Sequence, residues 1–87
     1  MTDATPETVT MYGADWCRDC RRSKALLDRL DVTYDYVDVE ADLSAAARAE
    51  AVSGRKNIPV VVLPDGAVFV EPSDAELQTA LQTAGVL

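Results

Sequence analysis

Hydrophobic and polar positions change period several times along the chain, and the first changes predict a strand, a helix and a second strand. Residues 8–12 (TVTMY) are rich in strand-forming side chains and stop at Gly13, which predicts a short β-strand followed by a loop. From Cys17 to Leu30 the period is helical, because leucines recur at helical spacing: Leu26, Leu27 and Leu30. Residues 32–40 (VTYDYVDVE) alternate and are aromatic and β-branched, which predicts a second strand.

The following segment predicts a helix and then a hairpin. Residues 42–53 are alanine-rich, open with Asp42 as an N-cap candidate and stop at Gly54, which is typical of a helix. Two apolar runs, 60–63 and 67–70, flank a Pro-Asp-Gly turn. We expect these two runs to pair as antiparallel strands.

The last helix has the clearest start signal in the chain. Ser73, Asp74, Ala75 and Glu76 match a capping box and follow Pro72. An apolar stripe comes next and Gly85 ends it: Leu77, Ala80, Leu81 and Ala84.

The order of these elements predicts an α/β domain over residues 7–87, with residues 1–6 as a frayed end. A right-handed crossover would make the first two strands parallel, and the hairpin would add two antiparallel strands. We therefore expect a four-stranded mixed sheet flanked by three helices, in the order β-α-β-α-β-β-α.

Composition narrows the class of protein. The chain has 87 residues, which suits one domain with a small core, and a formal charge of -7, which disfavours a nucleic-acid surface. No apolar run approaches the ~20 residues of a membrane span, and the first residues lack the features of a secretion signal. We expect a cytosolic monomer whose acidity serves solubility.

The candidate chemistry lies in the stretch DWCRDCRR, residues 15–22, which holds both cysteines of the chain. A structural disulfide is disfavoured in a reducing cytosol. A structural zinc site needs four ligands, and this chain has no histidine and only two thiols. A reactive Cys-x-x-Cys pair after the first strand is a redox signature, so we predict a redox pair and no metal.

Position assigns different roles to the two thiols. Residues i and i+3 share a helix face, so Cys17 and Cys20 can form and break a disulfide without moving the backbone. Cys17 lies at the helix start, where unpaired N–H groups stabilise a thiolate, so we expect it to be the exposed nucleophile. Cys20 lies one turn further in and is the candidate resolving thiol, or a bystander if a second small thiol releases the intermediate.

Two aromatic residues near the pair leave alternatives open. Trp16 is either a core residue or the apolar rim of the site beside the thiol. Tyr12, at the end of the first strand, is either core or a wall of the site.

Three segments together resemble a known family: YGADWCRDC (12–20), NIPVVV (57–62) and EPSDAEL (71–77). In this order and spacing the chain resembles the glutaredoxins within the thioredoxin fold, and looks most like the actinobacterial mycoredoxins. The resemblance implies a thiol-disulfide oxidoreductase with no bound cofactor and a low-molecular-weight thiol, mycothiol or glutathione, as co-substrate.

The resemblance also implies roles for four further residues. Pro59 would be the family's cis-proline, and Ile58 would offer its backbone to an extended substrate; otherwise Pro59 simply begins an edge strand. Ser73 and Asp74 would lie near the carboxylate or sugar of a bound thiol, although helix capping alone also explains Ser73.

Arg18 and Asp19 depart from the family pattern, because glutaredoxins usually carry proline or glycine and then an aromatic residue between the cysteines. The identity of the thiol therefore stays open, and we place both residues in the substrate site. Our leading hypothesis is reduction of mixed disulfides between proteins and a small thiol. The alternatives are a thioredoxin-like reductant of protein disulfides, recharged by a flavin-dependent reductase, and a non-catalytic binding module or redox sensor.

Overall fold

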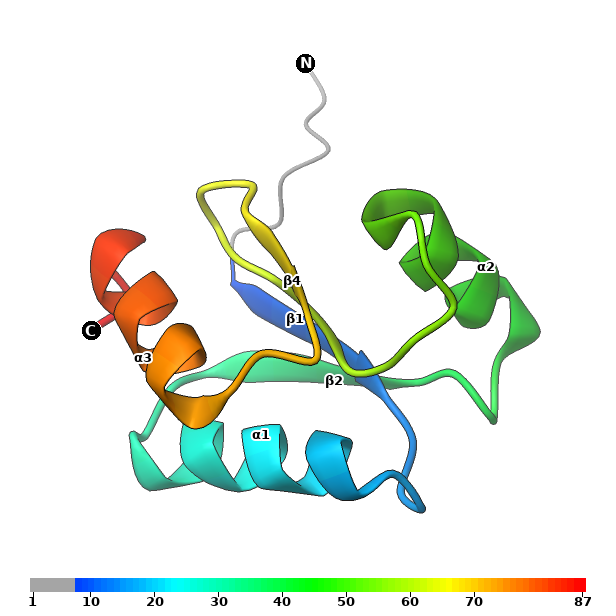
Figure 1. Cartoon of the computed structure of the whole chain (residues 1–87), viewed down its shortest axis with the longest axis horizontal. Helices are drawn as coiled ribbons and strands as arrows, with labels where there is room; N and C mark the ends of the chain where they lie inside the picture. Colours follow the sequence, from blue (N-terminus) through cyan, green and yellow to red (C-terminus); the bar gives the residue numbers. More distant parts are fainter. Residues whose placement is uncertain (1–7) are drawn as a thin grey trace.

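The computed structural model describes residues 8–87, so the expected frayed end at residues 1–6 lies outside the described residues. Strands and helices alternate along this part of the chain before a final hairpin and helix (Figure 1). The elements are β1 (Val9–Gly13), α1 (Arg18–Arg29), β2 (Tyr34–Asp38), α2 (Leu43–Ser53), β3 (Val60–Val62), β4 (Val68–Val70) and α3 (Asp74–Thr83).

The strands form one four-stranded sheet in the order β2-β1-β3-β4. β1 pairs in parallel with β2, in a register that places Met11 opposite Tyr36. On its other edge β1 pairs antiparallel with β3, and β3 pairs antiparallel with β4. This mixed sheet confirms the predicted fold class and element order.

The two faces of the sheet are covered by different helices. Val9 and Met11 of β1 are buried and belong to one apolar cluster with Leu27 of α1 and Leu77 of α3. α1 and α3 therefore pack on this face, because alternate strand residues point to the same side. The two buried residues of α2, Ala45 and Ala49, lie outside that cluster. α2 itself contacts β1 and β4.

Most of the observed elements are slightly shorter than predicted, although β1 keeps its predicted length of five residues and is shifted by one. β2 spans five residues rather than the predicted 32–40, because its ladder with β1 runs only from Val9 opposite Tyr34 to Gly13 opposite Asp38. Asp38 then accepts hydrogen bonds from the next backbone N–H groups, which turns the chain. The start of the last helix agrees closely with the prediction, since the capping box is present.

No helix among residues 8–87 is both long enough and apolar enough to cross a bilayer.

Candidate active site

Cys17 is the N-cap residue of α1, at the end of the short loop that leaves β1. Its backbone N–H donates to Ala14 O at 3.1 Å, and its φ of -81° and ψ of 119° are extended rather than helical. The Cys17 sulfur accepts a hydrogen bond from the backbone N–H of Cys20 at 3.2 Å. The sulfur thus occupies the place that a serine or aspartate oxygen takes in an ordinary helix cap. A negative charge on this sulfur would therefore lie beside an N–H donor and at the positive end of the helix dipole, and both interactions favour it.

The Cys17 thiol is more covered than the sequence led us to expect. Only 7% of the residue is exposed, and the thiol donates to the carbonyl of Ile58 at 3.8 Å. The expectation of an exposed nucleophile was therefore wrong in this respect, because residues 56–58 lie across the start of α1. Cys17 lines a pocket between these segments.

Cys20 lies deeper, with 1% exposed, on the inner face of α1. Both thiols are free. Burial raises the pKa of the Cys20 thiol to about 12, and the hydrogen bond with Cys17 adds to the effect. Cys20 also explains Gly13: a Cβ placed there would lie 3.1 Å from the Cys20 sulfur, tighter than nine in ten real Cβ contacts. The candidate resolving thiol is thus protonated at neutral pH and tightly enclosed.

The pocket in front of Cys17 has a volume of about 370 Å³ and brings residues from three segments together. Five of its lining residues were predicted for the site: Trp16, Cys17, Arg18, Asp19 and Ile58. Three more line it that we did not predict, namely Lys56, Asn57 and Glu71. No local pattern marks these three, because only the folding of distant segments places them beside Cys17.

Trp16 borders this pocket and is 66% exposed, which excludes the interpretation of Trp16 as a core residue. An exposed indole at the mouth of a pocket offers an apolar surface to a bound substrate. Its role in substrate binding stays a prediction.

The backbone around Pro59 has the geometry that the resemblance implied. The Ile58–Pro59 peptide bond is cis, and Pro59 is fully buried. The Pro59 carbonyl accepts from the backbone N–H of Glu71 at 2.9 Å, while the Ile58 carbonyl faces the Cys17 thiol. The chain therefore presents the backbone of residue 58 directly to the reactive sulfur.

Five predicted residues do not line the pocket: Cys20 and Pro59, which are buried beside it, and Tyr12, Ser73 and Asp74. Tyr12 pairs with Val37 and Val60 inside the sheet, and strand alternation turns it away from the face that holds Met11. Ser73 caps α3, its hydroxyl accepting from Glu76 N at 3.1 Å. The Asp74 carboxylate lies 3.6 Å from Nε of Arg22. For the start of α3 the structure thus shows the capping alternative directly.

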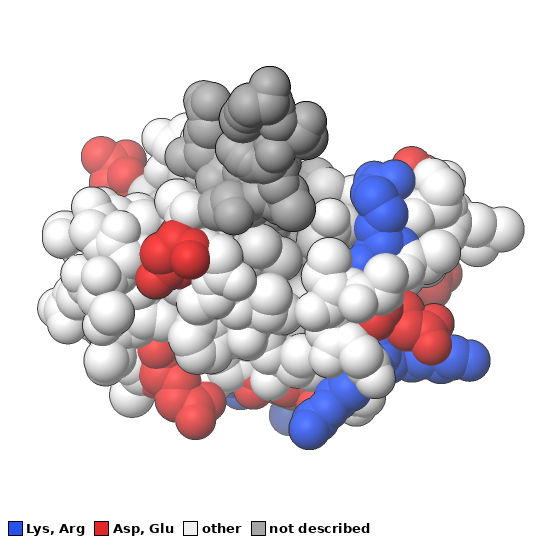
Figure 2. All heavy atoms as spheres, turned by 90° about the horizontal axis from the view of Figure 1, so that it is seen from above, with Lys and Arg blue, Asp and Glu red and all other residues white. Residues whose placement is uncertain are grey.

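Basic side chains gather near the site although the chain is acidic. In Figure 2 the Lys and Arg side chains lie toward one end of the visible face, the end at which Figure 1 places α2 and the loop between β1 and α1, whereas Asp and Glu lie toward both ends. By sequence, five of the chain's eight Lys and Arg residues belong to the first turns of α1 or to the loop before β3: Arg18, Arg21, Arg22, Arg55 and Lys56. The lining of the Cys17 pocket carries two cations, Arg18 and Lys56, and two carboxylates, Asp19 and Glu71, so it has no net charge although the whole chain carries -7.

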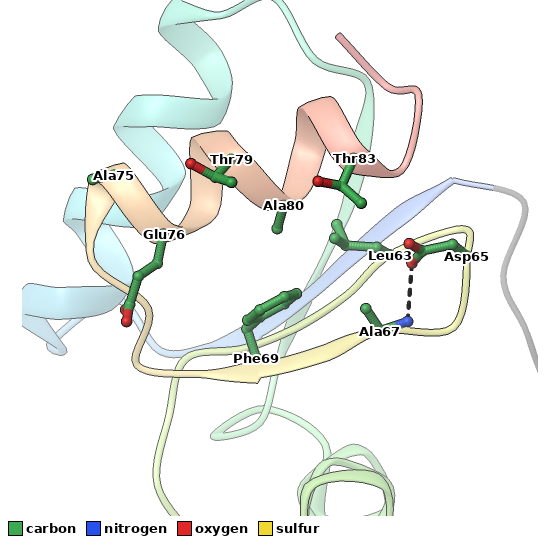
Figure 3. A pocket seen from close by; sticks show the side chains of 9 residues that line it. All are labelled: Leu63, Asp65, Ala67, Phe69, Ala75, Glu76, Thr79, Ala80 and Thr83. Atoms are coloured by element: carbon green, nitrogen blue, oxygen red, sulfur yellow. Dashed lines mark hydrogen bonds between the residues drawn. The ribbon is translucent and has the colours of Figure 1, made fainter.

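A larger cavity, of about 460 Å³, lies elsewhere, between α3 and the β3–β4 hairpin (Figure 3). Apolar side chains such as Leu63, Phe69 and Ala80 point into it, and Asp65 lies at the turn of the hairpin. Neither cysteine lines this cavity, so it carries none of the redox chemistry.

A Cys-x-x-Cys pair capping the first helix, beside a cis-proline that opens the third strand, defines a thiol protein of the thioredoxin fold. The comparison with protein families narrows the class. The glutaredoxin family model matches residues 9–69, and the chain belongs to the glutaredoxin family, a family of thiol-disulfide oxidoreductases. The predicted family and enzyme class are thereby confirmed.

Individual relatives agree with this assignment. Mycoredoxin 1 of Corynebacterium glutamicum is 38% identical over 71 residues, which cover 79% of this chain and 86% of the relative. The crystal structure of a glutaredoxin from Archaeoglobus fulgidus superposes with a TM-score of 0.78 at 23% identity, covering 87% of each chain. The solution structure of a Brucella melitensis glutaredoxin gives a TM-score of 0.62 at 26% identity, covering 92% of this chain and 85% of that one.

Proposed function

We propose that this protein reduces mixed disulfides between proteins and a low-molecular-weight thiol, with Cys17 as the nucleophile. The observation that carries the proposal is the position of Cys17, whose sulfur caps α1 by accepting the Cys20 N–H and which lines a pocket together with Ile58. A thiolate in this position is stabilised by the helix and is open to a disulfide that enters the pocket.

The reaction exchanges one disulfide for another. The Cys17 thiolate attacks the sulfur of the small thiol, a bond forms between the two sulfurs, and the target protein leaves as a thiolate that takes up a proton. A second molecule of the small thiol, as its thiolate, then attacks the same small-thiol sulfur. The Cys17 thiolate is restored and the two electrons end in the target thiol, while the small thiol is oxidised to its disulfide.

The pocket residues supply binding rather than chemistry in this scheme. Ile58 and Pro59 would hold the substrate through the backbone, and Trp16 would cover its apolar part. Arg18 and Asp19 would contact the small thiol where relatives carry an aromatic residue. Ser73 and Asp74 remain candidates for its far end, although neither lines the pocket itself.

Mycothiol is the thiol that we favour. The similarity to mycoredoxin 1 supports this choice, because that relative shares 38% of its residues with the chain over 71 positions. The same proposal places the reaction in the cytosol, where thiols are kept reduced.

Mass spectrometry of two single variants tests this function. Cys20→Ser protein incubated with mycothiol disulfide is expected to gain one mycothiol on Cys17, and Cys17→Ser protein is expected to gain none. Glutathione disulfide serves as the competing probe. Full reductase activity in the Cys17→Ser variant would falsify the assignment of the nucleophile, and exclusive addition of glutathione would overturn the choice of thiol.

The second candidate is a dithiol route, in which Cys20 attacks the Cys17 sulfur and a flavin-dependent reductase reopens the disulfide. It is favoured by the spacing of the pair, since the Cys17 sulfur already lies 3.2 Å from the Cys20 backbone nitrogen. Recharging by a thioredoxin reductase, in the absence of any small thiol, would select this route. Recharging only by mycothiol and its own reductase would select the first.

A further inference from the structure

Three separate segments line the Cys17 pocket: the start of α1, the loop before β3 and the residues after β4. Hydrogen bonds join the first segment to the second and the second to the third. The start of α1 meets the loop before β3 where the Cys17 thiol donates to Ile58 O at 3.8 Å. That loop meets the residues after β4 where the Glu71 N–H donates to Pro59 O at 2.9 Å. The side chain of Arg22 joins α1 to the residues after β4, 71–74.

The guanidinium of Arg22 contacts three groups at this junction. Nη2 donates to the carbonyl of Pro72 at 3.1 Å, and Nε lies 3.6 Å from the carboxylate of Asp74. On α1 itself, Nη1 donates to the Asp19 carboxylate at 3.2 Å. Within residues 8–87, Arg22 supplies every hydrogen bond and ion pair that joins α1 to residues 71–74.

The segment that Arg22 holds has an unusual backbone. Glu71 has a φ of 52°, in the left-handed region that residues other than glycine rarely adopt. Such a conformation persists only where surrounding contacts determine it. Glu71 also lines the Cys17 pocket and accepts a hydrogen bond from the side chain of Asn57 at 3.3 Å. A shift of this segment would therefore change the pocket wall.

We propose that Arg22 is a positioning residue for the substrate pocket. By holding Pro72 and Asp74 against α1, it keeps Glu71 at the edge of the pocket in front of Cys17. This inference rests on the proposed function, because the mixed disulfide is what the wall would contact. The Arg22 side chain is 43% exposed, and exposed ion pairs contribute little to stability, so the effect falls on substrate binding rather than on folding.

A lysine cannot replace the arginine in this role. The planar guanidinium presents several N–H donors in a fixed fork and can reach two carboxylates and a carbonyl at once, whereas an ammonium is a compact charge on a flexible chain. Arg22→Lys therefore keeps the charge near Asp19 and Asp74 but loses the link to the Pro72 carbonyl. Comparing Arg22→Lys with Arg22→Gln therefore separates the effect of the guanidinium's hydrogen bonds from the effect of its charge.

The experiment compares Arg22→Gln and Arg22→Lys with Arg29→Gln, a matched control on the last turn of the same helix. The substrate is a mixed disulfide of mycothiol with a short uncharged cysteine peptide, and KM and kcat are measured separately. Alkylation of Cys17 by iodoacetamide, in a Cys20→Ser background, measures the reactivity of the Cys17 thiol. This small reagent does not depend on the pocket wall for binding. Amide hydrogen exchange at Glu71 measures the order of the segment independently of activity.

For both Arg22 variants we expect a KM about tenfold higher, because a misplaced pocket wall positions the substrate less well. The Glu71 amide should exchange about tenfold faster, since its bond to Pro59 O opens more often. The alkylation rate and the midpoint of unfolding should stay close to those of the unsubstituted protein, and Arg29→Gln should match it throughout.

Two results would overturn the inference. The first is unchanged exchange at Glu71 in Arg22→Gln, which would show that the segment is held without Arg22. The second is a normal KM in Arg22→Lys, which would show that charge alone matters. If the unsubstituted protein does not turn over the mixed disulfide, the proposed function fails, and the exchange measurement still decides the role of Arg22.

Discussion

Replacing Cys20 with serine separates the two routes by which the Cys17 intermediate can be released. The substitution removes the second thiol but keeps the backbone N–H of residue 20, which donates to the Cys17 sulfur at 3.2 Å. The nucleophile therefore keeps its cap. If a small thiol releases the intermediate, we expect turnover with mycothiol to stay within about threefold of the unsubstituted protein.

The size of the effect follows from the pKa of Cys20. At a pKa of about 12 the thiol is ionised in about one molecule in 10⁵ at pH 7, against about one in 100 at its ordinary pKa of 9.0. The greater basicity of its thiolate recovers about 20-fold of this roughly 1000-fold deficit. Attack by Cys20 is thus about 50-fold slower than attack by an unperturbed thiol at the same distance.

The assay follows this step directly by stopped flow. Cys17 is loaded with a chromophoric aromatic thiol, and release of the chromophore by Cys20 is recorded between pH 6 and 9. Burial is the largest cause of the raised Cys20 pKa, and it remains when Cys17 is modified. The fraction of Cys20 thiolate, and with it the rate of chromophore release, should therefore rise about tenfold per pH unit over this range. A rate that begins to level off towards pH 9 would refute the reasoning, since it would show a Cys20 thiol with its ordinary pKa of 9.0. The Cys20→Ser protein, which lacks the attacking group, gives the background rate.

Three further predictions concern stability and packing. The Cys20 thiol has an ordinary pKa of 9.0 and a pKa of about 12 in the folded protein, so it is protonated in both the folded and the unfolded state well below pH 9. In urea denaturation this group should therefore leave the free energy of unfolding constant up to about pH 9 and lower it between pH 9 and 12. The loss of stability in that range should be smaller in Cys20→Ser. Ser23 is fully buried and its hydroxyl has no hydrogen-bond partner within residues 8–87, so Ser23→Ala should leave the melting temperature unchanged or raise it, and a fall of several degrees would reveal a partner. Gly13→Ala should destabilise the fold by about 1–3 kcal/mol, because the added methyl meets the Cys20 sulfur at 3.1 Å; a denaturation midpoint equal to that of the unsubstituted protein would contradict this.

Local sequence signals determined the elements and the reactive pair. Period-2 and helical patterns predicted each strand and helix, and the capping box at Ser73 located the start of α3. The Cys-x-x-Cys spacing identified the chemistry because i and i+3 thiols at a helix start have one geometry whatever the rest of the chain does. These features are local, so they can be read without knowing the fold.

Contacts between distant segments could not be predicted in the same way. Lys56, Asn57 and Glu71 reach the pocket only because β3 pairs with β1 and β4 pairs with β3. Tyr12 seemed to face the site from the end of its strand, but strand alternation and pairing with Val60 place it on the other face. The length of β2 was likewise set by its partner, since its ladder runs only beside the residues of β1.

The sequence by itself determined that this is a glutaredoxin-type α/β domain whose two thiols cap and enter the first helix. Only the tertiary structure decided how those thiols are presented. It covers Cys17 with the loop before β3, encloses Cys20 against Gly13 and ties α1 to residues 71–74 through Arg22. The physical reason is that helix formation depends on near neighbours, whereas burial and pocket shape depend on which distant segments fold against the helix.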